Sequence, residues 1–273
     1  MVTGASTGIG HASAKHLAGL GYQVFAGVRR DEDADRLRQA DSRIEPVRID
    51  VTDQASIDAT AERVRDATGG SLAGLVNNAG IAVPGPLEYL PIEEFRRQIE
   101  VNLVGQVAVT QAFLPMLRTA KGRVVNIGSI GGRVALPLLG PYAASKHAME
   151  GLTDSLRREL KPAGIKVSII RPGPIATEIW ERGNNTADEL LERMPGVEQD
   201  YGQAIAASRA WAAERAGEAV PPSAVAEVVG DALTADKPRT RYIVGPRAKM
   251  MVRLREVLPD RWFDALIERL ASR

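Results

Sequence analysis

The stretch that decides the fold opens the chain: Met1-Val2-Thr3-Gly4-Ala5-Ser6-Thr7-Gly8-Ile9-Gly10. A short apolar segment leads into a glycine-rich turn, and an amphipathic helix is predicted to follow through about Leu20. Glycines let the backbone approach a pyrophosphate closely, and the first turn of a helix offers free N–H groups and the positive end of its dipole. The stretch therefore predicts a phosphate cradle, although an ordinary strand-to-helix turn would carry the same glycines.

The apolar segment before these glycines is short. A dinucleotide-binding fold has a full strand there, and strands usually contain about five residues. Only Met1 to Thr3 precede Gly4. Either the first strand is curtailed, or further residues precede Met1.

Strands and helices are predicted to alternate after the turn. The predicted strands are 22–28, 44–49, 72–76, 122–127, 166–170 and 242–244, and the predicted helices include 56–68, 92–117, 142–160 and 221–235. This alternation is typical of a parallel sheet with helices on both faces, in an α/β fold. Ligands of such sheets bind at the carboxyl ends of the strands.

Several polar or glycine-containing motifs lie at predicted strand ends. They are Gly4–Gly10, Val28–Arg30, Asp50-Val51 and Asn77-Asn78-Ala79-Gly80. An acidic residue at the end of the second strand would hold the ribose 2′-hydroxyl of NAD, but this chain has Arg29 and Arg30, and guanidinium groups suit a 2′-phosphate. The arginines therefore favour NADP(H), unless they are only solvated loop charges.

A phenol and an ammonium recur four residues apart at Tyr142 and Lys146. Residues at this spacing on a helix lie on one face, with Cβ atoms roughly 5–6 Å apart. A free tyrosine has a pKa near ~10, and a fixed positive charge nearby lowers the pKa of its phenol. The pair is a candidate proton donor and acceptor, although the same spacing also arises by chance in helices.

Two further polar residues are candidates for the same site. Ser129 follows the predicted strand 122–127, where its hydroxyl can donate to a substrate oxygen beside the phenol. Asn102 lies within the predicted helix 92–117, where an asparagine usually faces water.

Taken together, these motifs resemble the short-chain dehydrogenase/reductase family over roughly residues 2 to 245. The matching residues are Thr3-Gly4-x-x-x-Gly8-Ile9-Gly10, Asn77-Asn78-Ala79-Gly80, Asn102, Ser129, Tyr142-x-x-x-Lys146 and Arg171-Pro172-Gly173-Pro174-Ile175-Ala176-Thr177. The resemblance implies a doubly wound, Rossmann-type parallel sheet of about seven strands. It also implies hydride transfer between a nicotinamide and an alcohol or carbonyl.

The resemblance assigns a role to each matching residue. It makes Tyr142 the acid/base, with Lys146 lowering the phenol pKa and holding the nicotinamide ribose, Ser129 positioning the substrate oxygen, and Asn102 supporting a water relay. The implied cofactor contacts are Gly4, Ser6, Thr7, Gly8, Ile9, Gly10, Arg29, Arg30, Asp50, Val51, Asn77, Ala79, Gly80, Tyr142, Lys146, Pro172, Gly173, Ile175 and Thr177. Of these, Asp50 and Asn77 are expected on the adenosine side, and Pro172, Gly173, Ile175 and Thr177 around the nicotinamide.

One departure from the family pattern concerns the cofactor. NADP-preferring relatives often carry a basic residue inside the glycine loop, where this chain has Ser6-Thr7. The NADP(H) prediction therefore depends on Arg29, with Arg30 as support.

The remaining sequence is divided into a lid and a tail. We assign residues 1–245 to one dinucleotide-binding domain with a substrate lid at about 178–222, and 246–273 to a helical extension of it. Apolar candidates for the substrate wall, or for simple helix packing, are Ile179, Trp180, Leu190, Leu191, Met194 and Trp211. The tail repeats apolar residues at helical spacing, broken at Pro259, and three roles stay open: packing on its own domain or over the substrate mouth, forming a subunit interface, or lying on a membrane surface.

Composition excludes several classes of function. The 35 basic and 34 acidic residues leave a net charge of +1, which gives no electrostatic case for nucleic acid as a partner. The chain has no cysteine, and its 3 histidines show no ligand spacing, so we predict neither disulfides nor a metal site. No apolar run approaches the length of a membrane span and no signal peptide precedes the first motif, so we expect a cytoplasmic protein. We also expect a homodimer or homotetramer.

The sequence thus predicts an NADP(H)-dependent oxidoreductase for a lipophilic secondary alcohol or ketone. Few polar anchors in the lid favour a lipophilic substrate, and the segment 24–29 together with the tail resembles family members that act on steroid- or retinol-like alcohols. Two alternatives are a reductase of 3-oxoacyl thioesters and a non-catalytic dinucleotide-binding sensor or scaffold.

Overall fold

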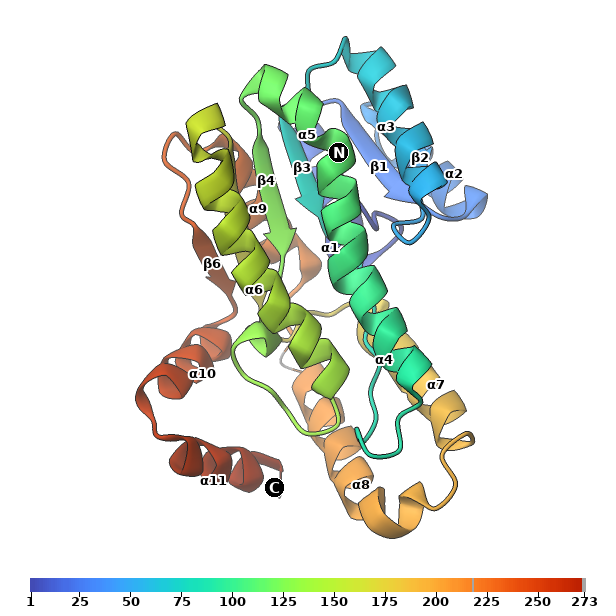
Figure 1. Ribbon diagram of the computed structural model, residues 1–273, viewed down its shortest axis with the longest axis vertical. Coiled ribbons are helices and arrows are strands. Elements are labelled where there is room, and N and C mark those ends of the chain that lie inside the picture. Colours follow the sequence, from blue (N-terminus) through green and yellow to red (C-terminus); the bar gives the residue numbers. More distant parts are fainter. Residues whose placement is uncertain (218, 272–273) are drawn as a thin grey trace.

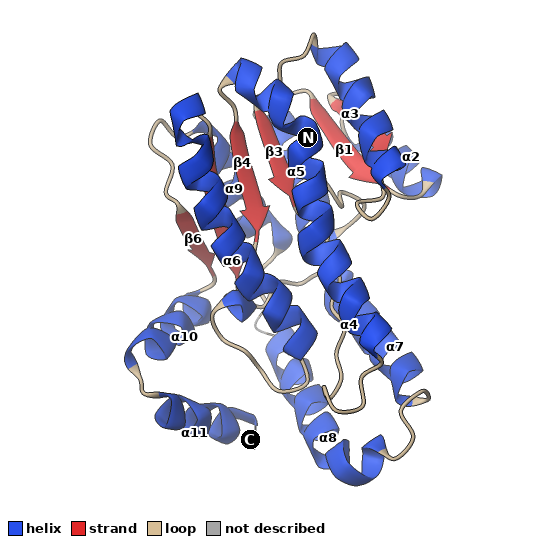
Figure 2. Cartoon of the chain, in the orientation of Figure 1, coloured by secondary structure: helices blue, strands red, loops and turns tan. Residues whose placement is uncertain are grey.

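A central parallel sheet lies between layers of helices in the computed structural model, which describes residues 1–217 and 219–271. Figure 1 shows two helical arms, formed by residues 178–216 and 246–271, that extend from one end of this layered body. The red strands of Figure 2 run side by side through the middle of the body, flanked by blue helices.

The structure contains six strands among the described residues, all in parallel pairs. They are β1 (Val24–Val28), β2 (Ile44–Arg48), β3 (Gly74–Asn77), β4 (Arg123–Ile127), β5 (Lys166–Pro172) and β6 (Arg241–Val244). The helices of the body are α1 (Gly8–Gly19), α2 (Asp31–Ala40), α3 (Gln54–Thr68), α4 (Ile92–Ile99), α5 (Gly105–Ala120), α6 (Gly140–Leu160) and α9 (Pro222–Thr234). The arms contain α7 (Glu178–Leu191), α8 (Val197–Ala216), α10 (Pro246–Val257) and α11 (Asp260–Ala271).

The curtailed first strand occupies the middle of the sheet. Val2 forms parallel bridges with Ala26 of β1 on one side and Val76 of β3 on the other, and it is fully buried. It therefore joins the pair β1-β2 to the four strands β3-β4-β5-β6. Among the described residues the sheet has six strands and this bridging residue, where about seven strands were predicted.

Each face of the sheet carries its own apolar core. Strand residues alternate in direction, so Val24, Ala26 and Val28 join α1, α2 and α9 in one cluster, whereas Phe25 joins α3, α5 and α6 in the other. A parallel sheet covered on both faces requires strands that are apolar throughout, and all five residues of β1 are buried. The prediction of a doubly wound α/β fold, with helices on both faces of a parallel sheet, is confirmed.

The predicted single helix 92–117 is divided. The structure has α4, then a wide π-helical turn over Glu100–Val104, and then α5. Asn102 lies in this turn and is 1% exposed, so it does not face water as an asparagine within a helix usually does. Such π turns often mark functional positions because they redirect a side chain.

Among the residues described, none of the helices combines the length and the apolar character that a membrane crossing requires.

Candidate active site

The glycine-rich turn is fixed by close backbone packing. Gly4 has a φ of +62°, and a Cβ atom there would lie 2.8 Å from the Cα atom of Ala79. A Cβ atom at Gly10 would overlap the carbonyl of Gly4 and lie 2.5 Å from Nδ2 of Asn78. Only glycine fits at either position, and the turn leads directly into the first turn of α1, whose N–H groups can receive a pyrophosphate.

Thr3 and Asn78 hold this turn in place, although the sequence patterns gave neither a role. The Oγ1 atom of Thr3 accepts hydrogen bonds from the backbone N–H groups of Asn78 at 2.9 Å and Ala79 at 3.0 Å. The Nδ2 atom of Asn78 donates to the carbonyl oxygens of Thr3 and Gly4, both at 3.0 Å. Their placement at adjacent strand ends was the available signal.

The side chain of Asn77 points in a different direction from the one predicted. Its side chain is 3% exposed, and Nδ2 donates to Oγ1 of Thr110 at 2.8 Å and to Oδ1 of Asn126 at 2.9 Å. Successive side chains of a strand point to opposite faces, so Asn77 points toward α5 while Asn78 points toward the glycine turn. The side chain of Asn77 therefore braces β3, β4 and α5 and does not face the adenosine side.

The two arginines after β1 differ in the contacts that their side chains make. Arg30 donates two hydrogen bonds to the carboxylate of Asp33, at 3.1 Å and 3.3 Å, which raise the pKa of Arg30. Arg29 is exposed and lies close enough to Asp50 for its charge to act on that carboxyl. Partial burial opposes the shift, but hydrogen bonds from Thr52 and the charge of Arg29 together lower the pKa of Asp50. Arg29 is thus the more available of the two for an anionic ligand.

Val51, Ala79 and Gly80 contribute to the site through packing. Val51 is 7% exposed and belongs to the core beneath α3 and α5. Ala79 and Gly80 form the wall opposite the glycine turn, and a Cβ atom at Gly80 would lie 3.3 Å from Oδ1 of Asn102.

Ser129, Tyr142 and Lys146 come together at the end of β4. They are 9%, 7% and 7% exposed. A Cβ atom at Gly131 would lie 3.1 Å from Cε1 of Tyr142 and 3.3 Å from Oγ of Ser129, and a hydrogen bond links the two hydroxyl groups. The Nζ atom of Lys146 donates to the carbonyl oxygen of Ile127 at 2.8 Å and lies 5.8 Å from the centre of the Tyr142 ring.

Burial decides the protonation of this group. Burial raises the pKa of the Tyr142 phenol, against the opposing effect of its hydrogen bond with Ser129. Burial also lowers the pKa of Lys146 to about 8. We expected Lys146 to lower the pKa of Tyr142; in the chain alone the desolvation of the phenol has the larger effect, since the ammonium points to the carbonyl of Ile127.

Asn102 links the loop after β3 to α6. Its Oδ1 atom accepts from the backbone N–H of Ile81 at 2.9 Å, and its Nδ2 atom donates to the carbonyl of Ile81 at 3.0 Å and to Oγ of Ser145 at 3.2 Å. Ser145 directly precedes Lys146. Gln98, which the sequence patterns missed, holds the same loop by accepting from the N–H of Val83 at 2.7 Å and donating to the carbonyl of Ile81 at 2.9 Å.

The turn after β5 reaches the glycine turn. A Cβ atom at Gly8 would lie 3.0 Å from Cγ2 of Thr177. The backbone of the turn is fixed by Val220, which donates to the carbonyl of Pro174 and accepts from the N–H of Ala176, both at 3.0 Å. Ile175 is 3% exposed and packs in the core, so its side chain is directed away from solvent. The glycine turn and the turn after β5, which were predicted to hold the two ends of a dinucleotide, therefore lie next to each other.

The lid forms a small core of its own. Leu190 and Met194 are buried with Val83, Leu90 and Val197, so helix packing accounts for both. Leu191 packs against the same cluster, Ile179 and Trp211 are half-buried, and the side chain of Trp180 lies outside the described residues. Polar pairs at the surface add to this cluster.

These surface pairs join the lid to residues 88–94. Tyr89 donates to the carboxylate of Asp200, and Tyr201 donates to Glu88 at 2.9 Å. Arg193 lies 2.9 Å from Glu93 and 3.1 Å from Glu94.

The tail packs on the body beside the site. A Cβ atom at Gly173 would lie 2.9 Å from Cβ of Ala248 in α10, and Glu256 lies 3.5 Å from Arg133, which follows the Ser129 turn. Helix α11 contacts α8 of the lid. Met250, Val257 and Trp262 of the tail are exposed.

Comparison with known proteins agrees with this geometry. The family model described as short chain dehydrogenase matches residues 1–188. An NADPH-dependent 3-dehydrocapnine reductase of Ornithobacterium rhinotracheale is 37% identical, with 97% of this chain and 94% of the relative covered. Human retinol dehydrogenase 16 is 38% identical, with 97% and 86% covered.

Solved structures give the same result. A short chain dehydrogenase from Burkholderia cenocepacia in complex with NADP has a TM-score of 0.74 and 29% identity, over 98% of this chain and 95% of the other. A Burkholderia phymatum short chain dehydrogenase/reductase in complex with NAD has a TM-score of 0.80 and 27% identity, over 93% and 91%. The chain belongs to the short-chain dehydrogenase family of dinucleotide-binding oxidoreductases, and it resembles the retinol dehydrogenases among them.

Proposed function

We propose that this protein is an NADP(H)-dependent oxidoreductase that interconverts a lipophilic ketone and its secondary alcohol, with Tyr142 as the acid/base. The observation that carries the proposal is the buried group of Ser129, Tyr142 and Lys146. Two linked hydroxyl groups and one ammonium gather there, next to the turn that reaches the glycine cradle.

Ketone reduction is the direction that the protonation of Tyr142 favours. The raised pKa keeps the phenol neutral at physiological pH, so it is ready to donate its proton. Negative charge develops on the substrate oxygen as the ketone is reduced, and two hydroxyl donors aimed at that oxygen stabilise it. Ser129 orients the oxygen, and Tyr142 gives it the proton.

Lys146 and Asn102 support this proton transfer. Below pH 8 the ammonium of Lys146 is largely charged, and only one of its three N–H donors is used by Ile127. We assign the remaining donors to the nicotinamide ribose and to a water held near Asn102. Through that water, Lys146 would return a proton to Tyr142 after each turnover.

The glycine cradle suits a dinucleotide, because the tightly packed turn at Gly4–Gly10 leads directly into α1, whose first N–H groups can receive a pyrophosphate. When bound, the nicotinamide supplies the hydride in reduction or accepts it in oxidation. The availability of Arg29, together with an NADPH-dependent relative and an NADP-bound structural neighbour, supports NADP(H) as the preferred form.

A lipophilic substrate is supported by the surroundings of the site. The tail packs beside the catalytic group through Ala248 and Glu256 and exposes apolar side chains at Met250, Val257 and Trp262. One relative is a retinol dehydrogenase. We infer that α7, α8 and the tail enclose the apolar part of the substrate.

The direct test is NADPH consumption with a panel of lipophilic ketones, 3-oxoacyl thioesters and simple sugars. We expect turnover with the ketones and little with the sugars. Selective turnover of the thioesters would replace the ketone proposal. Tight NADPH binding without turnover on any carbonyl would favour the sensor or scaffold alternative.

The cofactor preference has a separate test in Arg29→Asp. The new carboxylate repels a 2′-phosphate and accepts a hydrogen bond from a free 2′-hydroxyl, so the Kd of NADPH should rise about tenfold or more while that of NADH changes less. Arg30→Gln is the matched control, since Arg30 is already paired with Asp33. Tighter binding of NADH than of NADPH by the unmodified chain would contradict the assignment.

A further inference from the structure

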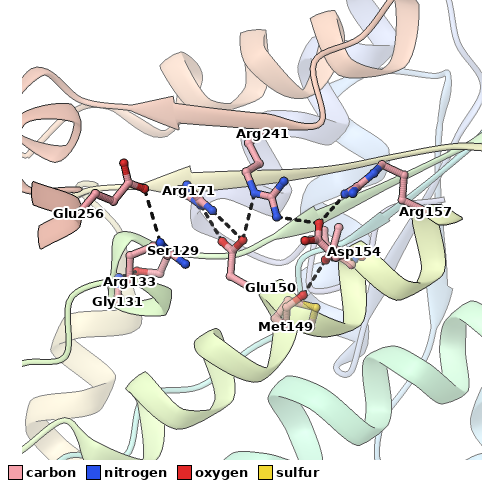
Figure 3. A network of polar contacts seen from close by, with 12 residues as sticks. Ser129, Gly131, Arg133, Met149, Glu150, Asp154, Arg157, Arg171, Arg241 and Glu256 are labelled. Atoms are coloured by element: carbon pink, nitrogen blue, oxygen red, sulfur yellow. Dashed lines mark hydrogen bonds and ion pairs between the residues drawn. The ribbon is translucent and has the colours of Figure 1, made fainter. Parts of the chain in front are cut away.

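A buried ion-pair network adjoins the candidate active site (Figure 3). The guanidinium of Arg171 in β5 donates two hydrogen bonds to the carboxylate of Glu150 in α6, at 2.6 Å and 2.8 Å. Arg241 of β6 extends the network, with Nε 3.5 Å from Glu150 and Nη2 2.6 Å from Asp154. Glu150 and Arg171 are only 8% and 5% exposed, so they meet in nearly dry surroundings.

Glu150 lies where three parts of the site meet. It follows Lys146 by one helical turn and Tyr142 by two, so it lies on the same side of α6. A Cβ atom at Gly132, in the turn that begins at Ser129, would lie 3.5 Å from Cγ of Glu150. Its partner Arg171 directly precedes Pro172, the last residue of β5, after which the turn reaches the glycine cradle.

Stability alone does not require a charged pair at this place. Burying two charges costs desolvation energy, and well-packed apolar residues of similar volume often serve stability equally well. A bidentate guanidinium–carboxylate pair differs from apolar packing in fixing both a distance and an angle. Its value here is therefore geometric.

We propose that Glu150 and Arg171 are positioning residues, whose paired hydrogen bonds hold the face of α6 that carries Tyr142 and Lys146 in register with the turn at 173–177. The inference rests on the proposed function for the assignment of that turn to the nicotinamide. Neither residue touches substrate, and both act through the segments that they join.

The outer part of the network supplies a matched control. Partial burial opposes ionisation of Asp154, but hydrogen bonds from Arg157 and Arg241 lower its pKa to about 2, so it stays ionised. Asp154 lies one turn beyond Glu150 and joins α6 to β6, without contact to Arg171. Asp154→Asn removes a charge from the same network and leaves the turn after β5 untouched.

The experiment compares Glu150→Gln, Arg171→Lys, the apolar double variant Glu150→Leu/Arg171→Met, and Asp154→Asn. Each is titrated with NADPH and with 2′-phospho-ADP-ribose, a fragment that lacks the nicotinamide. Thermal unfolding is recorded for each variant. The kcat and KM for a ketone and the isotope effect with deuterated NADPH are then measured.

A positioning role predicts a selective loss. In Glu150→Gln, Arg171→Lys and the double variant, NADPH affinity should fall at least fivefold relative to that of the fragment. The kcat should fall at least tenfold with a larger isotope effect, because hydride transfer becomes limiting. The double variant should unfold near the temperature of the unmodified chain, and Asp154→Asn should stay within twofold in each ligand measurement.

Two results would overturn the proposal. One is an unchanged ratio of the two affinities in the single variants and the double variant. The other is a double variant that does not fold, which would give the pair a structural role. The binding ratio needs no substrate, so it decides this inference even if the unmodified chain turns over no ketone and the proposed reaction fails.

Discussion

The two walls of the site are built in different ways. The glycine turn is determined by backbone contacts, since Cβ atoms at Gly4 and Gly10 would collide with main-chain atoms or with Asn78. The lid is held by a small apolar cluster and by exposed pairs such as Tyr201–Glu88 and Arg193–Glu93. Backbone contacts restrict a position to one residue type, whereas exposed pairs contribute little and tolerate change.

This difference explains why the residues of the cofactor wall can be predicted from the sequence and those of the substrate wall cannot. Substitutions on the cofactor side and in the catalytic group should have large, selective effects. Substitutions in the lid should have small effects, mainly on the KM of the substrate.

The largest contrast is expected between two tyrosines. Tyr142→Phe removes the proton donor, which is expected to lower kcat for ketone reduction by about 10²–10⁴-fold while NADPH binding is retained. Tyr89→Phe removes a lid hydroxyl whose hydrogen bond to Asp200 raises the pKa of Tyr89 to about 12, and kcat should stay within a few-fold. Steady-state kinetics and NADPH titration measure both, and equal losses in the two variants would break the contrast.

The second contrast compares two glycines of α1. Gly10→Ala forces a carbon against the carbonyl of Gly4, a strain of about 1–3 kcal/mol or more, which corresponds to a roughly tenfold to hundredfold rise in the Kd of NADPH. Gly19→Ala meets no atom within 4 Å and should stabilise the helix by about 0.5–1 kcal/mol. NADPH titration and thermal unfolding check both. Tight NADPH binding by Gly10→Ala would show that the glycine turn does not hold the cofactor.

The third prediction concerns pH. Because the pKa of Lys146 is lowered to about 8, its ammonium is lost as pH rises through that value. The kcat/KM for ketone reduction should be flat below pH 8 and fall up to ~tenfold per pH unit above it. Lys146→Arg should move this fall to higher pH, since an arginine keeps its charge. A profile that rises between pH 8 and 10 would contradict the role of Lys146.

The smallest effect is expected in the lid. Arg193→Gln removes the pairs with Glu93 and Glu94, and a weakened lid should raise the KM of the ketone by about two- to fivefold with kcat within twofold. Arg63→Gln, at the exposed pair with Glu45, is the matched control and should change neither constant. A tenfold fall of kcat in Arg193→Gln would show that the lid takes part in the chemical step.

The sequence predicted the order of strands and helices well because hydrophobic periodicity and glycine turns are local signals. The sequence left open whether the first strand is curtailed or further residues precede Met1, and the structure places Val2 in bridges with both neighbouring strands. The break in the helix at Asn102 was not predicted, since it depends on hydrogen bonds to Ile81 and Ser145, which are distant in the chain.

Side-chain direction and protonation were the less predictable part of the site. Asn77 and Asn78 are adjacent in one motif, but only the register of β3 decides which of them turns to the cradle. The direction of the Tyr142 pKa shift depends on burial, which spacing on a helix does not report. The Glu150–Arg171 pair joins residues 21 positions apart, and no local pattern marks it.

The most direct test of the central claim is the carbonyl stretching frequency of a bound ketone, measured by infrared difference spectroscopy with a ¹³C-labelled carbonyl in the complex with NADP⁺. That complex cannot react, so it reports only how the hydroxyl groups address the substrate oxygen. We expect a frequency lowered by hydrogen bonds in the unmodified chain and in Tyr89→Phe, and a clearly smaller lowering in Tyr142→Phe. The same frequency in the unmodified chain and in Tyr142→Phe would contradict the assignment of Tyr142 as the group that protonates the substrate.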